Sequence, residues 1–104
     1  MYYLYVLVNL DKKSFRKFYV GVTDDLMKRV AEHNDGQSNY TSKFGPWKLV
    51  YYEAYLSATD AGRRERQLKH HGKGFQELKK RLSYSIQHLL GSQGAGNETK
   101  KVRD

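Results

Sequence analysis

The stretch KFYVGVTDDLMKRVAEHN (residues 17–34) combines a strand, a glycine and the start of a helix in one short run. Its segment FYVGV (residues 18–22) is rich in β-branched and aromatic residues, which favour a strand. The residues TDD (23–25) follow, and their oxygens and negative charge suit the beginning of a helix. Leu26 and Val30 then lie four residues apart, as on the buried side of a helix. The stretch therefore predicts a strand that leads directly into a helix.

Outside this stretch, the same reasoning predicts two more strands and two more helices. Residues 1–9 are a breaker-free apolar run that pairs as a hairpin with residues 18–22 across a polar loop. Residues 34–47 are dense in Asn, Gly and Ser and predict a loop. The later elements are a strand at residues 48–56, a helix at 57–71, a break at Gly72 and Gly74, and an amphipathic helix at 75–90. The order ββ-α-β-α-α predicts an α+β fold, a small antiparallel sheet flanked by helices.

Length and composition limit the class of protein. The 104 residues suffice for one domain, which we place at residues 1–90, followed by a disordered basic tail at residues 91–104. The absence of cysteine excludes disulfides, thiolate zinc sites and cysteine nucleophiles. The first apolar run is too short to span a bilayer and lacks a signal-peptide layout, so we expect a soluble, cytoplasmic protein with no membrane partner. A net charge of +8 favours nucleic acid as the partner.

Five polar residues at the strands and helices have side chains suited to phosphodiester chemistry. They are Tyr5 and Tyr19 on the first two strands, Arg29 and His33 one turn apart on a helix, and Glu65 on a later helix. An arginine can hold a phosphate with two hydrogen bonds, and a carboxylate can bind one Mg²⁺ ion. Tyrosine or histidine can move a proton. Taken singly, however, each residue also fits an ordinary structural role in packing, on a solvated helix face or in a local ion pair.

The order of these residues resembles the GIY-YIG nuclease superfamily. The resemblance rests on YLYVLV (3–8), KFYVGVTDDLMKRVAEHN (17–34), TSKFGPWKLVYYE (41–53) and AGRRERQLK (61–69), and it covers residues 2–82. The chain looks most like the small stand-alone bacterial members, whose domain is similar to the nuclease module of the excision-repair incision protein. The resemblance implies a three-stranded antiparallel sheet flanked by helices. It also implies hydrolysis of DNA with one Mg²⁺ or Mn²⁺ ion.

The same resemblance implies a role for each candidate residue. Glu65 would hold the metal, Arg29 would clamp the scissile phosphate, and Tyr5 would accept the proton of the attacking water, alone or relayed by His33. Tyr19 would orient water or phosphate. A tyrosine base needs a lowered pKa, because a free phenol is protonated at pH 7.

Three features of the motifs bear on these roles. Gly21 is predicted to provide a tight structural turn into the helix. The first of the two motifs that name the family corresponds to residues 4–6 of this chain. The chain departs from it at Leu4, which stands where the family has a glycine. It also lacks the asparagine that larger members of the family carry after the helix with the metal-binding glutamate, which here is Glu65.

We therefore expect a metal-dependent DNA endonuclease, structure-selective or weakly sequence-specific, acting in DNA repair, recombination or processing. The alternative is a non-catalytic nucleic-acid-binding module on the same fold. The substrate is expected to be branched, nicked or single-stranded DNA, with RNA, a protein partner and the choice between monomer and weak dimer left open. The basic residues predicted to contact nucleic acid are Lys12, Lys13, Arg16, Lys17, Lys43, Arg63, Arg64 and Lys69.

Overall fold

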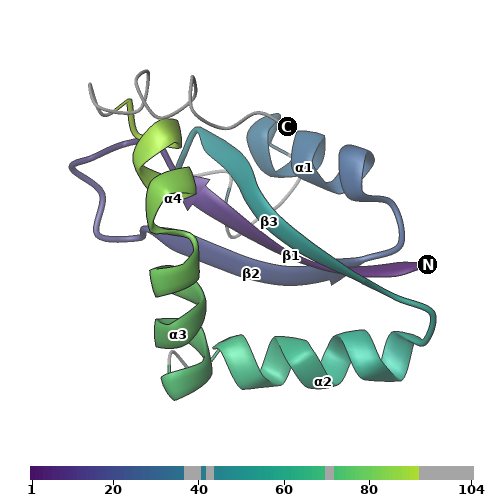
Figure 1. The fold of residues 1–104 in the computed structure, drawn as a ribbon. Helices are drawn as coiled ribbons and strands as arrows, with labels where there is room; N and C mark the ends of the chain where they lie inside the picture. The colour runs from purple at the N-terminus through teal and green to yellow at the C-terminus, as the bar shows by residue number, and fades with distance from the viewer. Residues whose placement is uncertain (37–40, 42–43, 70–71, 92–104) are drawn as a thin grey trace, which may run out of the picture.

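The computed structural model describes residues 1–36, 41, 44–69 and 72–91. These residues form three strands and four helices in the order ββαβααα (Figure 1). The elements are β1 (Tyr2–Asn9), β2 (Phe18–Thr23), α1 (Leu26–Asn34), β3 (Trp47–Tyr55), α2 (Ala58–Lys69), α3 (Lys73–Arg81) and α4 (Ser83–Leu89). The predicted α+β fold with a three-stranded antiparallel sheet is confirmed.

The sheet has the strand order β2-β1-β3, with β1 in the centre. β1 pairs antiparallel with β2, which confirms the predicted hairpin, and antiparallel with β3. Its residues from Leu4 to Asn9 are all buried, as expected for a strand with a partner on each side and helices on both faces. β2 is therefore an edge strand, and side chains from a helix can reach past it.

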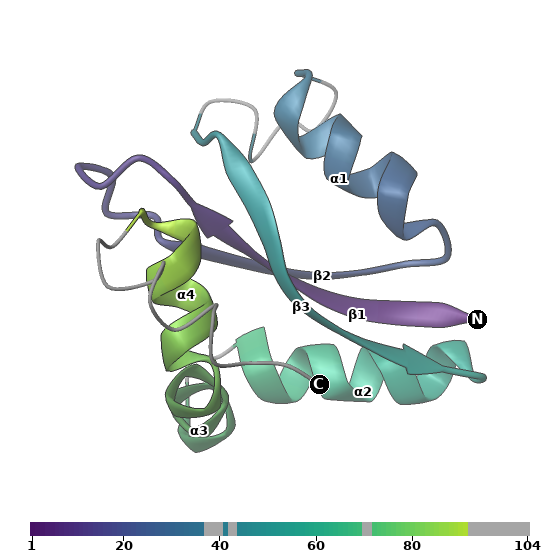
Figure 2. The same cartoon turned by 45° about the horizontal axis from the view of Figure 1, so that its top comes forward.

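The two faces of the sheet are covered by different helices (Figure 2). Successive strand residues point to opposite faces, so Leu4 and Val6 pack with Leu68 of α2 and Phe75 of α3 in one cluster. On the other face, Tyr5, Leu7 and Trp47 form a second cluster against Leu26 and Val30 of α1. The predicted buried side of α1 is thus confirmed. Tyr5, unlike its neighbours Leu4 and Val6, faces α1.

The last predicted helix is wrong in one respect, because it is two helices. The backbone leaves helical geometry at Leu82 (φ −102°, ψ 13°), and its N–H donates to the carbonyls of both Leu78 and Lys79. The apolar three- and four-residue spacing continues across this bend, so the pattern cannot reveal it. After the bend, α4 lies against β3. The predicted break is also shorter, since Gly72 is the N-cap of α3 and Gly74 lies inside its first turn.

Some predictions fall on residues outside the described part of the chain. These are Lys43, the adjacent pair His70 and His71, and the tail from residue 92 onward. Within the described helices, none is long and apolar enough to cross a membrane.

Candidate active site

The predicted site residues gather around Gly21, and the ring of Tyr5 lies directly over the backbone of this glycine. Tyr5 on β1 is paired directly with Gly21 on β2. A Cβ atom on Gly21 would lie 2.6 Å from Tyr5 Oη, 2.7 Å from Tyr5 Cζ and 3.0 Å from Tyr19 Cε2. The predicted tight turn at Gly21 is wrong, since the residue lies inside β2 and has no left-handed backbone. The missing side chain makes room for the Tyr5 phenol instead.

The Tyr5 hydroxyl is one end of a buried row of hydrogen-bonded groups. It lies 2.7 Å from Nε2 of His33, and Nδ1 of His33 is hydrogen-bonded to Oγ1 of Thr41. The three residues are 1%, 0% and 0% exposed. They come from β1, α1 and the segment before β3, so the fold holds the row from three sides.

Tyr19 and Lys69 complete one side of this row. The Tyr19 ring centroid lies 4.7 Å from that of His33 and 6.2 Å from that of Tyr5. The ammonium of Lys69 on α2 lies 5.6 Å from the centroid of the Tyr19 ring. α2 packs on the opposite face of the sheet, so the Lys69 side chain reaches Tyr19 past the edge strand β2.

Arg29 brings positive charge to the Tyr5 hydroxyl. The positive charge of its guanidinium acts on Tyr5, and its Nη1 forms an ion pair with Glu32 at 2.8 Å. The Arg29 side chain is 33% exposed. A guanidinium has five N–H donors, so this arginine retains donors for a further anion.

Glu65 contributes the carboxylate of the cluster. Its charge acts on Tyr5, and its Oε2 lies 3.2 Å from the ammonium of Lys69. The side chain is 26% exposed, so a ligand from solvent can reach it. Among the residues that the structure describes, no group of three or more His, Cys, Asp or Glu side chains could hold a metal. A single oxygen ligand fits Mg²⁺, which keeps several waters, and does not fit a structural zinc site or a calcium cage.

Burial controls the protonation of the central pair. It raises the pKa of Tyr5, and the neighbouring Tyr19 raises it further, while Arg29 partly opposes both. This direction is opposite to the lowered pKa that a lone tyrosine base needs. Burial, followed by the charge of Arg29, lowers the pKa of His33 to about 4. At neutral pH the phenol therefore keeps its proton, and the imidazole is neutral and able to accept one.

The structure brings together all five predicted site residues, from four different elements. The basic residues predicted to bind nucleic acid are more dispersed. Lys12, Lys13 and Lys17 are exposed on the loop between β1 and β2. Arg63 is exposed and pairs weakly with Asp60 at 3.4 Å.

Two arginines of the predicted nucleic-acid surface have structural contacts. Arg64 donates to both oxygens of Glu53 on β3, at 3.0 and 3.1 Å. Arg16 packs its guanidinium 5.2 Å from the centroid of the Phe44 ring. Both side chains therefore help to hold the fold, whatever else they contact.

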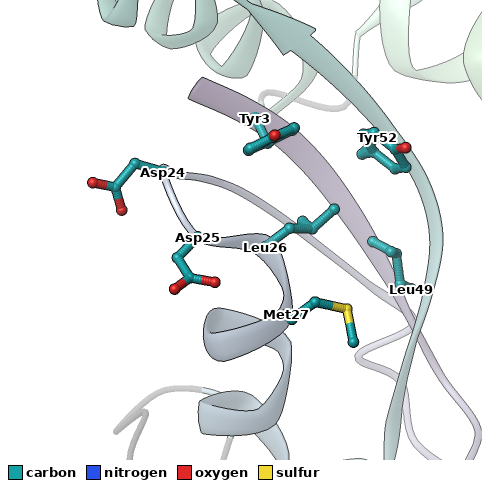
Figure 3. Close-up of a pocket in the computed structure, with 7 residues that line it drawn as sticks. All are labelled: Tyr3, Asp24, Asp25, Leu26, Met27, Leu49 and Tyr52. Carbon is teal, nitrogen blue, oxygen red and sulfur yellow. The ribbon is translucent and has the colours of Figure 1, made fainter. Parts of the chain in front are cut away.

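A hollow lies beside the N-terminus of α1, apart from this cluster (Figure 3). It is an open groove of about 450 Å³, and its lining comprises Tyr3, Asp24, Asp25, Leu26, Met27, Leu49 and Tyr52. Its polar rim is acidic, because Asp24 and Asp25 supply the charged groups. A phosphate would be repelled there, so the cluster around Gly21 is the better candidate for phosphodiester chemistry.

Sequence reasoning missed Thr41. The residue lies in a polar loop, and its contact with His33 joins positions eight residues apart in segments without a shared periodicity. A threonine in such a loop has no pattern that separates it from its neighbours.

Known proteins are similar to this chain in sequence. The model of the GIY-YIG catalytic domain matches residues 1–80. A UPF0213 protein of Lacticaseibacillus paracasei is 41% identical over 70 residues, which is 66% of this chain and 74% of that protein. A UPF0213 protein of Halobacterium salinarum is 37% identical over 70 residues, covering 66% of this chain and 86% of the relative. The solution NMR structure of a UPF0213 protein from Bacillus halodurans has a TM-score of 0.45 and 27% identity, covering 99% and 100% of the two chains.

Proposed function

The chain belongs to the family of the GIY-YIG catalytic domain, and from this premise we propose that it is a metal-dependent endonuclease that hydrolyses phosphodiester bonds in DNA. The observation that carries the proposal is the convergence of Tyr5, Tyr19, Arg29, His33 and Glu65 around Gly21. These groups supply a phosphate clamp, a proton acceptor and a metal ligand within one cluster.

Arg29 is the residue that would bind the scissile phosphate. Its side chain is partly exposed, and its ion pair with Glu32 uses only part of its donor capacity. A guanidinium can hold two phosphate oxygens at once and offset the negative charge that grows in the transition state. Loss of one such donor group typically lowers kcat by about 10² to 10³-fold.

Tyr5 and His33 are the residues that would remove the proton from the attacking water. Tyr5 alone is a poor base, because burial raises its pKa. As a pair, Tyr5 accepts the proton of the water while its own hydroxyl proton passes to His33 Nε2, 2.7 Å away. Burial disfavours a lasting imidazolium, so this proton resides on His33 only briefly.

Glu65 is the residue that would hold the metal ion. A bound Mg²⁺ or Mn²⁺ would supply Lewis-acid stabilisation of the phosphate and the leaving oxygen. Lys69 also forms an ion pair with the Glu65 carboxylate at 3.2 Å. This pairing keeps the partly buried carboxylate neutralised and oriented.

A cleavage panel tests the proposal. The full chain is incubated with nicked, flapped, branched and single-stranded DNA in the presence of Mg²⁺ or Mn²⁺, and product ends are analysed. We expect metal-dependent cleavage that Glu65→Ala and Arg29→Ala each reduce at least about 100-fold. Glu77→Ala is the matched control, since this carboxylate lies exposed on α3 and should leave the rate unchanged. The nuclease proposal would be refuted if the wild type showed no metal-dependent cleavage. It would also be refuted if the two site variants cleaved DNA as fast as the wild type.

The same panel distinguishes the non-catalytic alternative. The exposed Lys12, Lys13 and Lys17 favour it, because they could bind phosphates without any chemistry. A pure binder would hold DNA with an affinity that falls steeply as salt rises, through counterion release, and would produce no cleavage.

A further inference from the structure

The buried hydrogen bond between His33 and Thr41 has no assigned role. Thr41 is fully buried, and its hydroxyl contacts Nδ1 of His33, the ring nitrogen that faces away from Tyr5. Its carbonyl accepts hydrogen bonds from Trp47 Nε1 and from the Phe44 amide, both at 3.0 Å. Thr41 is therefore fixed to the core cluster around Trp47, and its hydroxyl is held at a set place beside the imidazole.

Two arrangements of hydrogens are compatible with this row of groups. In the first, Tyr5 donates its O–H to Nε2, and Nδ1–H donates to the Thr41 oxygen. In the second, Thr41 donates to Nδ1, and Nε2–H donates to the Tyr5 oxygen. A neutral imidazole has one donor and one acceptor nitrogen, so the two arrangements correspond to its two tautomers.

Arg29 decides between them. Its positive charge acts on the Tyr5 hydroxyl, and a guanidinium can donate hydrogen bonds but not accept them. A hydroxyl beside such a cation is stabilised when its oxygen faces the charge and its hydrogen points away, here toward Nε2 of His33 at 2.7 Å. The second arrangement would place the Nε2–H of His33 against the Tyr5 oxygen and turn the hydroxyl hydrogen toward the guanidinium, which is electrostatically unfavourable.

We propose that Thr41 is a positioning residue that holds His33 in the Nδ1–H tautomer, with Nε2 kept free to accept the hydroxyl proton of Tyr5. The tautomer rests on the contacts of His33 with Tyr5 and Thr41 and on the charge of Arg29, whereas its consequence for the rate rests on the proposed nuclease function. Replacement of Thr41 by valine removes the acceptor and leaves a buried N–H without a partner. The ring then adopts the Nε2–H tautomer, which cannot take the proton of Tyr5.

Nitrogen-15 NMR of the full chain tests the tautomer directly. Histidine labelled in the ring is incorporated, and the His33 signals are identified by their loss in His33→Gln. At pH 7 the wild type should show a protonated Nδ1 and an unprotonated Nε2. Thr41→Ser should keep this pattern because it keeps the hydroxyl, and Thr41→Val should shift His33 to the other tautomer. Thr59→Val, an exposed position on α2, is the matched control and should change nothing.

Kinetics give the second measurement. Thr41→Val should lower kcat by about 10² to 10⁴-fold, the usual contribution of general acid–base catalysis, with KM unchanged, while Thr41→Ser stays near the wild type. A protonated Nε2 in the wild type, or an unchanged tautomer in Thr41→Val, overturns the proposal. If Thr41→Val does not fold, the wild-type and Thr41→Ser spectra still decide it. The tautomer pattern without any DNA cleavage would support the positioning role and refute the nuclease function.

Discussion

Gly21→Ala is the substitution that most directly tests the geometry of the cluster. The added Cβ would lie 2.6 Å from the Tyr5 hydroxyl oxygen and 2.7 Å from Cζ, whereas ordinary contacts begin at 3.4 Å. The phenol must therefore move by about 0.8 Å, and a displacement of roughly 1 Å at a catalytic group can cost about 100-fold in rate. The ring cannot move freely, because Tyr5 is buried and its hydroxyl is bonded to His33.

The same collision has a cost in stability. Overpacking of a filled core typically costs about 1–3 kcal/mol. The lower backbone entropy of alanine in the unfolded chain returns about 0.5–1 kcal/mol. We therefore expect Gly21→Ala to lower the free energy of unfolding by about 1–2 kcal/mol, which corresponds to a fall in Tm of roughly 4–16 °C for a domain of this size.

Urea denaturation followed by circular dichroism measures this loss, and the cleavage assay measures the rate. Gly62→Ala is the matched control, since a Cβ there would have its nearest contact at 3.8 Å, inside α2. Alanine favours a helix interior, so this control should be as stable as the wild type or up to about 1 kcal/mol more stable. In a Tyr5→Leu background, the cost of Gly21→Ala should largely disappear, because the crossing ring is gone. An equal cost in both backgrounds would refute the reasoning.

Three further predictions follow from other contacts. Burial and Arg29 hold the pKa of His33 at about 4 in the folded state, against 6.5 in the unfolded chain, so the unfolded state binds the proton first as pH falls. The free energy of unfolding of the wild type, measured in urea, should thus fall by up to about 3 kcal/mol between pH 6.5 and 4. The His33→Gln variant should not show this fall, and parallel pH profiles of the two proteins would contradict the prediction. Glu53→Gln leaves half-buried Arg64 without its ion pair and should lower the free energy of unfolding, measured in urea, by about 2 kcal/mol. A change of less than about 0.5 kcal/mol would show that this ion pair contributes little to stability. Asn34→Ala removes hydrogen bonds of 2.8 and 3.0 Å to the backbone of Trp47 and should lower Tm, with an unchanged Tm as the contrary result.

The fold could be predicted because its signals are local. β1 is a continuous apolar run, β2 ends at helix-capping residues, and the capping side chain of Asp25 indeed accepts from the amide of Lys28. The bend at Leu82 escaped prediction because the apolar spacing is the same before and after it. What separates α3 from α4 is the packing of α4 on β3, a contact between distant segments.

The candidate site was predictable in its membership and not in its chemistry. Family spacing indicated Tyr5 and His33, but the direction of the Tyr5 pKa depends on burial, which a motif does not encode. The role of Gly21 depends on the register between β1 and β2, since one residue of slippage would place Tyr5 opposite a side chain. Arg64 shows a related limit, because a run of basic residues on a helix does not reveal its ion-pair partner Glu53 on β3.

The candidate site is also part of the core, and this determines how variants must be interpreted. Tyr5 belongs to the buried cluster with Leu7 and Trp47, and His33 is fully buried beside it. Truncation of either residue to alanine would therefore remove chemistry and open a cavity at once, and a lost rate would have two explanations. Tyr5→Phe and His33→Gln keep most of the volume and remove the proton transfer. If these variants stay folded and lose cleavage, the loss belongs to the proton relay.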